Sequence, residues 1–134
     1  NTWQTVSPLR IARWGCAAVE FRNQVYVIGG QNHEPILQCE SRGSRSEWCM
    51  EPSLIEGRTS PTAAVLGGDL FVLGGSGGGS TVERLDLEAS QWTIEPLPAQ
   101  VPLRVAPTMA WSPYQGLVSI GGATAESPTT ALAR

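Results

Sequence analysis

The stretch VYVIGG at residues 25–30 joins a short apolar run, rich in β-branched side chains, to two adjacent glycines. The run predicts a β-strand, and the glycines predict a backbone that leaves the strand with positive φ, a conformation that other residues adopt only under strain. The same ending returns as FVLGG at residues 71–75 and as VSIGG at residues 118–122. We therefore expect one structural unit to be used three times.

Two other residue types share the period of these glycine pairs. Successive glycine pairs are 45 and 47 residues apart, three tryptophans are 45 and 44 apart, and three arginines are 45 and 46 apart. The residues are Gly29, Gly30, Gly74, Gly75, Gly121 and Gly122, then Trp3, Trp48 and Trp92, then Arg13, Arg58 and Arg104. Independent residue types with a common period indicate an internal repeat.

Each repeat consists of apolar runs of strand length separated by glycine, proline, asparagine and serine, without a helical pattern. After the arginine come a run of small apolar residues, a tight turn, the strand that ends in Gly-Gly, another short strand and a strand that carries the tryptophan. We therefore expect an all-β chain with four antiparallel strands per repeat. Such a unit is typical of a β-propeller blade.

The order of arginine, apolar run, double glycine and tryptophan resembles the kelch repeat, and the resemblance extends from Trp3 to Gly122. It implies a partial kelch-type propeller whose glycines allow close packing between blades. The expected units are an outer strand of a preceding blade at 1–9, blades at 13–53 and 58–97, and a truncated blade at 104–134. The kelch pattern also has a tyrosine about seven residues before the tryptophan. Ser41 and Leu85 stand there instead, which predicts weaker outer packing.

Propellers close with roughly four to eight blades, because a closed ring removes the open edges of the sheets. Three repeats are too few for such a ring. We therefore expect the remaining blades to be supplied in the same polypeptide or by a partner chain.

Composition favours a soluble globular protein, with 41% hydrophobic and 16% charged residues. The net charge is −3, the nine basic residues are all arginine and none is clustered, so neither nucleic acid nor a membrane is the expected partner. The sequence shows no apolar run long enough to span a bilayer and no signal peptide pattern, and we expect a cytoplasmic protein. Cys16, Cys39 and Cys49 fit no zinc pattern. They are interpreted as buried reduced thiols, with a disulfide between Cys39 and Cys49 as the alternative.

The strand order of a blade brings two sets of loops to one mouth of the channel. They are the loops that enter the first strand and the loops that follow Gly-Gly, and loops of this kind carry function in many folds. Arg13, Arg58 and Arg104 would form an arc of guanidinium groups there, suited to carboxylates of a partner. The resemblance supports this, since kelch adaptors of ubiquitin ligases grip acidic peptides with arginines at this position. The alternative is that each arginine ties its loop to backbone carbonyls.

Four further residues of these loops are candidate partner contacts. Trp14 lies outside the tryptophan period and next to Arg13, and tryptophan and arginine are enriched at binding hot spots. The alternative is that Trp14 packs under a loop. Ser60 belongs to the loops that enter the first strand, and Asn32 and His33 to the loops that follow Gly-Gly.

Signals for catalysis and for cofactors are weak. The stretch GGSGGGST at residues 74–81 has no following lysine and no helix, so it is interpreted as a surface loop rather than a phosphate site. His33 is the only histidine, and it is interpreted as a solvated loop residue; the alternative is that His33 and Glu34 form a general base or a weak metal pair. We therefore expect no enzyme activity, no metal and no cofactor.

The sequence as a whole predicts a protein interaction module that binds a partner protein or peptide at the mouth of a kelch propeller. It would serve as the substrate adaptor of a ubiquitin ligase or as a scaffold. One alternative is a structural subunit of a large cytoskeletal or organellar assembly. Another is a propeller enzyme or metal-dependent specifier protein whose ligands lie on other blades.

Overall fold

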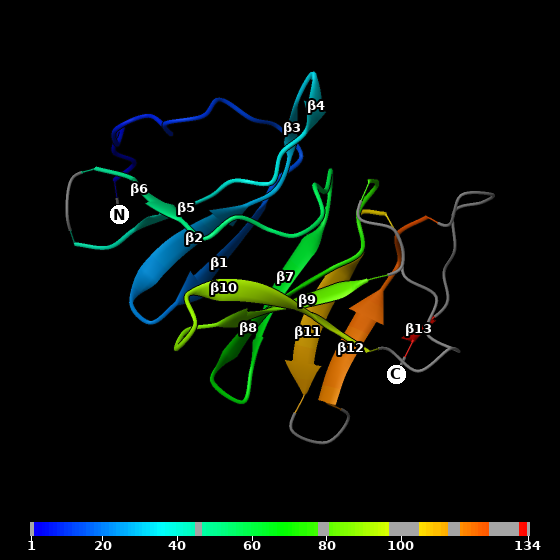
Figure 1. Ribbon diagram of the computed structural model, residues 1–134. Coiled ribbons are helices and arrows are strands. Elements are labelled where there is room, and N and C mark those ends of the chain that lie inside the picture. The colour runs from blue at the N-terminus through cyan, green and yellow to red at the C-terminus, as the bar shows by residue number, and fades with distance from the viewer. Residues whose placement is uncertain are drawn as a thin grey trace.

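The computed structural model describes residues 2–44, 47–77, 81–96, 105–112, 116–123 and 132–133 (Figure 1). All regular elements in these residues are β-strands, and the neighbouring strands of each sheet are antiparallel. The described residues contain no helix with the length and apolar character needed to cross a membrane. The all-β class predicted from the repeat is confirmed.

The first sheet has four strands in the order β1-β2-β5-β6. They are β1 (Ala17–Phe21), β2 (Gln24–Ile28), β5 (Cys39–Arg42) and β6 (Cys49–Glu51). Between β2 and β5 the chain makes a small separate hairpin of β3 (Gln31–Asn32) and β4 (Glu34–Pro35), which projects at the top of Figure 1.

The second sheet repeats this order with β7 (Thr62–Leu66), β8 (Asp69–Leu73), β9 (Val82–Asp86) and β10 (Gln91–Glu95). The third consists of β11 (Thr108–Ser112), β12 (Gly116–Ile120) and β13 (Leu132–Ala133). The first strands of the sheets are neighbours, since β1 contacts β7 and β7 contacts β11. The three sheets are therefore successive blades of a kelch-type propeller fragment, joined along their first strands.

Tight turns between the first two strands of each complete blade follow from the residues found there. Arg22 and Asn23 have φ of 52° and 60°, and Gly67 and Gly68 have φ of 62° and 92°. Two-residue hairpin loops favour two consecutive residues with positive φ, because the twist of such a turn matches the twist of the strands. These turns fix the register Phe21↔Gln24 in one blade and the equivalent pairing in the next.

Residues 2–9 form no strand in the structure, although an outer strand of a preceding blade was expected at 1–9. An outer strand is held by backbone hydrogen bonds to the third strand of its own blade. No described strand pairs with residues 2–9, and the side chain of Trp3 is fully exposed.

The hydrophobic core lies between the first and second blades. Its buried side chains come from both sheets and from the segment between them, and they are Phe21, Tyr26, Ile28, Cys39, Leu54, Leu70, Val72, Leu85 and Trp92. Phe21 and Tyr26 meet edge to face with ring centroids 5.7 Å apart, a favourable aromatic geometry. Packing of both sheets against this core agrees with the continuous apolar runs of strands such as β2 and β8.

The cysteines differ in their surroundings. All three are free thiols, so the disulfide between Cys39 and Cys49 is not formed. Cys39 is buried in the core, and burial raises the pKa of its thiol to about 12. The interpretation as buried thiols is wrong for Cys16 and Cys49, which are exposed.

Candidate functional site

The glycine pairs adopt the same conformation in all three repeats. Their φ values lie between 63° and 90°, in the left-handed region. A Cβ on Gly29 would lie 2.7 Å from the carbonyl oxygen of Arg58 in the next blade, and a Cβ on Gly30 would lie 2.7 Å from the carbonyl oxygen of Trp14 in its own blade. The first glycine therefore permits contact between blades, and the second permits contact with the loop that enters the first strand.

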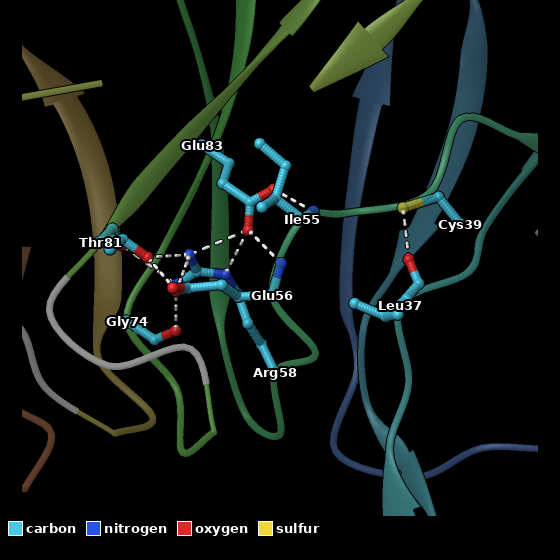
Figure 2. A network of polar contacts seen from close by, with 8 residues as sticks. All are labelled: Leu37, Cys39, Ile55, Glu56, Arg58, Gly74, Thr81 and Glu83. Carbon is cyan, nitrogen blue, oxygen red and sulfur yellow. Dashed lines mark hydrogen bonds and ion pairs between the residues drawn. The ribbon is translucent and has the colours of Figure 1, made fainter. Parts of the chain in front are cut away.

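Arg58 lies at the centre of a buried polar network in the second blade (Figure 2). Its Nε and Nη2 atoms donate to Oε1 of Glu83 at 3.1 and 3.0 Å. Its Nη1 atom donates to the carbonyl oxygens of Gly74 and Thr81, both at 3.0 Å. The side chains of Arg58 and Glu83 are both 0% exposed, so the guanidinium is fully used inside the protein.

The Glu83 carboxylate holds a second segment in place as well. It accepts hydrogen bonds from the backbone N–H groups of Ile55 at 2.6 Å and of Glu56 at 3.2 Å. These residues belong to the loop that leads into the second blade. The ion pair therefore ties together the loop entering β7, the glycine pair after β8 and the beginning of β9.

The first blade contains the same arrangement around Arg13. Its guanidinium donates to Oε1 of Glu40 at 2.8 Å and to the carbonyl oxygens of Gly29 and Gln38 at 2.9 and 2.6 Å. Both side chains of the ion pair are 0% exposed. Glu40 in turn accepts from the backbone N–H groups of Arg10 and Ile11. The arginine–glutamate network is thus a repeated part of the blade.

These contacts correct the interpretation that Arg13 and Arg58 grip the carboxylates of a partner. Both guanidinium groups are buried and already paired with glutamates of their own blade, so neither is available to the carboxylate of a partner. The structure shows the alternative, in which each arginine ties its loop to backbone carbonyls. Arg104, the third arginine of the set, lies outside the described residues.

The glutamate partners were missed in the sequence, although a signal for them exists. Glu40 and Glu83 each follow the first residue of a third strand, and they are 43 residues apart. A glutamate that recurs at the same place in the third strand of both blades, at nearly the period of the arginines, indicates a repeated partner of opposite charge.

Ser60 lies where the backbones of neighbouring blades meet. Its backbone N–H donates to the carbonyl oxygen of Gly15 at 2.7 Å, and its carbonyl oxygen accepts from the N–H of Ala106 at 3.0 Å. The three residues, in the order Gly15, Ser60 and Ala106, have positive φ of 60°, 52° and 53°. The backbone of Ser60 therefore links both neighbouring blades, its side chain is half-buried, and its partner contact stays a prediction.

Trp14, Asn32 and His33 remain as exposed candidates, and we call them the mouth patch. The Trp14 side chain is 61% exposed, yet its backbone is fixed by an antiparallel bridge to Gln31 with N–H to O distances of 3.1 and 2.9 Å. Asn32 and His33 follow in the β3–β4 hairpin, where His33 has φ of 74°. The patch therefore presents an aromatic ring from a rigid backbone beside two exposed polar side chains.

Two of the periodic tryptophans fix the segment that leads into their blade. The indole Nε1 of Trp48 donates to the carbonyl oxygen of Ser7, and that of Trp92 donates to the carbonyl oxygen of Pro52, both at 2.9 Å. Trp92 is 4% exposed within the core. A buried indole needs such an acceptor for its N–H, so these tryptophans are structural.

In the first blade, the structural equivalent of the kelch tyrosine position is Arg42, one residue after the Ser41 expected by counting back from Trp48. Counting from the buried glutamates, Arg42 is the equivalent of Leu85, because Glu40 and Glu83 both lie one position after the strand begins. Leu85 is 2% exposed and belongs to the core; the weaker outer packing expected without a tyrosine stays a prediction. Ser41 is the equivalent of Arg84, since they pair with Tyr26 and Phe71 at the same register position.

Comparison with known proteins agrees with this geometry. The family model described as the Kelch motif matches residues 57–96, which span the second blade. Kelch-like protein 23 of Mus musculus and that of Homo sapiens are each 25% identical to this chain over 99 residues, which is 70% of this chain and 17% of the relative. The chain thus matches only a small part of these relatives. The kelch repeats and the Kelch-like relatives support a protein interaction module. Together with the blades and glycine pairs, the match of residues 57–96 to the Kelch motif supports a kelch repeat protein.

Proposed function

We propose that this chain binds a partner protein or peptide through the mouth patch and has no chemistry of its own. The observation that carries the proposal is Trp14, whose ring is 61% exposed while its backbone is held by two hydrogen bonds. A large exposed aromatic side chain on a rigid backbone loses little conformational entropy on binding, which is typical of hot-spot residues.

The expected partner is not an acidic peptide, which an arc of exposed arginines would bind. Since the guanidinium groups of Arg13 and Arg58 are buried in ion pairs, they cannot supply donors to an acidic peptide. We expect the partner to offer an apolar pocket for the Trp14 ring and polar groups for Asn32 and His33. The partner contact would therefore depend only weakly on salt.

The experiment places a photo-crosslinking amino acid at position 14 of the intact protein and, as a control, at position 94. Ile94 is a matched control because it is 48% exposed but lies on the outer strand β10. A partner crosslinked from position 14 alone is then purified, and its affinity is measured for the Trp14→Ala and Ile94→Ala variants. We expect Trp14→Ala to weaken binding by roughly 30-fold or more, as at a hot spot worth about 2 kcal/mol. Equal effects of the two variants would refute the assignment of the patch.

A finer part of the proposal is that the chain serves as the substrate adaptor of a cytoplasmic ubiquitin ligase. The family resemblance supports the adaptor role, and the free thiols of Cys16 and Cys49 support a reducing compartment. The adaptor role requires that ubiquitylation of the partner in cells falls when Trp14 is replaced by alanine. A partner that binds at Trp14 but whose ubiquitylation is unchanged would identify a scaffold instead.

The open face of the first blade is expected to be covered by another blade, from the same polypeptide or from a partner chain. Val25 lies on this face and is 44% exposed, whereas Leu70, at the same register position of the second blade, is 0% exposed against the first blade. A Val25→Glu substitution should therefore destabilise the intact protein. An unchanged melting temperature would show that this face stays in solvent.

A further inference from the structure

The third and fourth strands of each complete blade are joined by a side-chain hydrogen bond at equivalent positions, but the residue that donates it differs between the blades. In the second blade, Arg84 of β9 donates from Nε to Oε1 of Glu95 on β10 at 2.7 Å. In the first blade, the equivalent positions on β5 and β6 hold Ser41 and Glu51, and the hydroxyl of Ser41 donates to Oε1 of Glu51. The carboxylate is therefore kept, while the arginine is replaced by a much shorter side chain.

A cavity of about 320 Å³ opens in the first blade beside this shortened side chain. It is lined by Gln24, Ser41, Glu47, Cys49 and Glu51 together with the turn at Gly43 and Ser44. The described lining contains two carboxylates and no cationic side chain. Its volume is at the lower end of ligand sites, which suits one side chain better than a large ligand.

We propose that this cavity, the outer-strand pocket, binds the guanidinium group of an arginine side chain from a partner protein. The second blade supplies the pattern for the bound state, because there an arginine of the chain itself occupies the equivalent position beside Glu95. The missing arginine leaves Glu51 with a serine hydroxyl at this position and leaves room for a guanidinium from outside.

The lining favours arginine over lysine. A guanidinium presents several N–H donors in one plane, which suits a pocket lined by the two carboxylates of Glu47 and Glu51 better than the single ammonium group of lysine does. The side-chain amide oxygen of Gln24 offers a further neutral acceptor at the start of β2. Ser41 is 2% exposed, so the inner end of the pocket is screened from solvent and its hydrogen bonds are strengthened.

This site is separate from the mouth patch and does not depend on the proposed function. The pocket is built by the third and fourth strands of the first blade, whereas the mouth patch precedes the first strand and follows the second. Trp14→Ala should therefore weaken only a partner that binds at the mouth patch. Glu51→Gln should weaken only a partner that inserts an arginine into the outer-strand pocket.

The test titrates the intact protein with N-acetyl-arginine methylamide and follows the side-chain amide signals of Gln24 by NMR. The matched probes are the lysine analogue and the citrulline analogue, which has nearly the same shape without the charge. We expect saturable shifts with the arginine probe, clearly weaker binding of the lysine probe and none with citrulline. Glu51→Gln should weaken binding of the arginine probe by about tenfold, the effect of losing one charged hydrogen-bond partner.

Two further variants complete the test. Ser41→Arg should fill the pocket from within, as Arg84 does in the second blade, and should abolish binding of the probe while the protein stays folded. Glu88→Gln removes an exposed carboxylate elsewhere and should leave binding unchanged. Equal binding of the arginine and citrulline probes, or no effect of Glu51→Gln, would overturn the proposal. Binding that occurs only after Arg45→Ala would also overturn it, since the chain's own arginine would then be the occupant.

Discussion

Replacing Arg58 by methionine should destabilise the protein strongly. The methionine can fill part of the space of the arginine stem, but it provides none of the donors. The Glu83 carboxylate, which is 0% exposed, would keep its contacts with the backbone N–H groups of Ile55 and Glu56 and lose the opposite charge. The carbonyl oxygens of Gly74 and Thr81 would lose the donor that joins them.

The magnitude follows from the burial of this pair. Removing one partner of a buried ion pair costs about 3 to 5 kcal/mol, because the other charge stays in an apolar environment. This is a large part of the roughly 5 to 15 kcal/mol that stabilises an ordinary domain. For a chain of this size we expect the melting temperature to fall by roughly 10 to 20 °C.

Thermal and urea unfolding of the purified protein, followed by circular dichroism, would measure the loss. Arg84→Met is the matched control, because Arg84 also pairs with a glutamate in the same blade but both side chains are 32% exposed. Its melting temperature should stay close to that of the unchanged protein, since exposed pairs contribute little. The double variant Arg58→Met with Glu83→Gln should recover part of the loss, because the charge is then removed as well.

One outcome would refute the reasoning. If Arg58→Met melted within a few degrees of the unchanged protein and failed to bind the partner, the guanidinium would be a contact residue and not part of the blade. A strong loss of stability, with binding retained at low temperature, would agree with the buried network.

The remaining predictions concern the glycine pairs, two tryptophans and the buried thiol. Gly29→Ala should destabilise more than Gly121→Ala. Both have positive φ, at 65° and 70°, but a Cβ on Gly29 would lie 2.7 Å from a carbonyl oxygen, whereas a Cβ on Gly121 would meet no described residue within 4 Å. Unfolding in urea compares the two variants, and equal losses would contradict the packing argument. Trp92→Ala should cost about 3 to 5 kcal/mol as a core truncation, whereas Trp14→Ala should leave the melting temperature nearly unchanged. Burial raises the pKa of the Cys39 thiol to about 12 from 9.0, so the unfolded chain loses this proton first and stability should fall as the pH rises above about 9. The same thiol should resist iodoacetamide at pH 8 until the protein unfolds, and rapid labelling of the folded protein would contradict its burial.

The sequence predicted the blades well because they follow from backbone requirements. Glycine pairs with positive φ, two-residue turns such as Arg22-Asn23 and short apolar runs have local physical causes, and these causes recur with the repeat. They were sufficient to predict the all-β class and the arrangement of successive sheets.

The direction of side chains could not be predicted in the same way. Arg58 precedes the first strand of its blade in either interpretation. The contact that holds its guanidinium inside the blade is made by Glu83, which lies on the third strand. The sequence also did not show that Ser41 and Arg84 occupy equivalent positions in their blades. The turn between the third and fourth strands differs in length between the blades, so counting back from Trp48 leads to the wrong residue. Contacts of this kind depend on distant pairing and not on local preference.

Main-chain hydrogen bonds between Gly15, Ser60 and Ala106 link each blade to the next. Because peptide groups make these links, the links do not depend on which side chains Ser60 and Ala106 carry. Substitutions at these two positions can therefore preserve the contact between blades. A glycine at residue 60 or 106 should adopt the positive φ found there with less backbone strain than the residue now present.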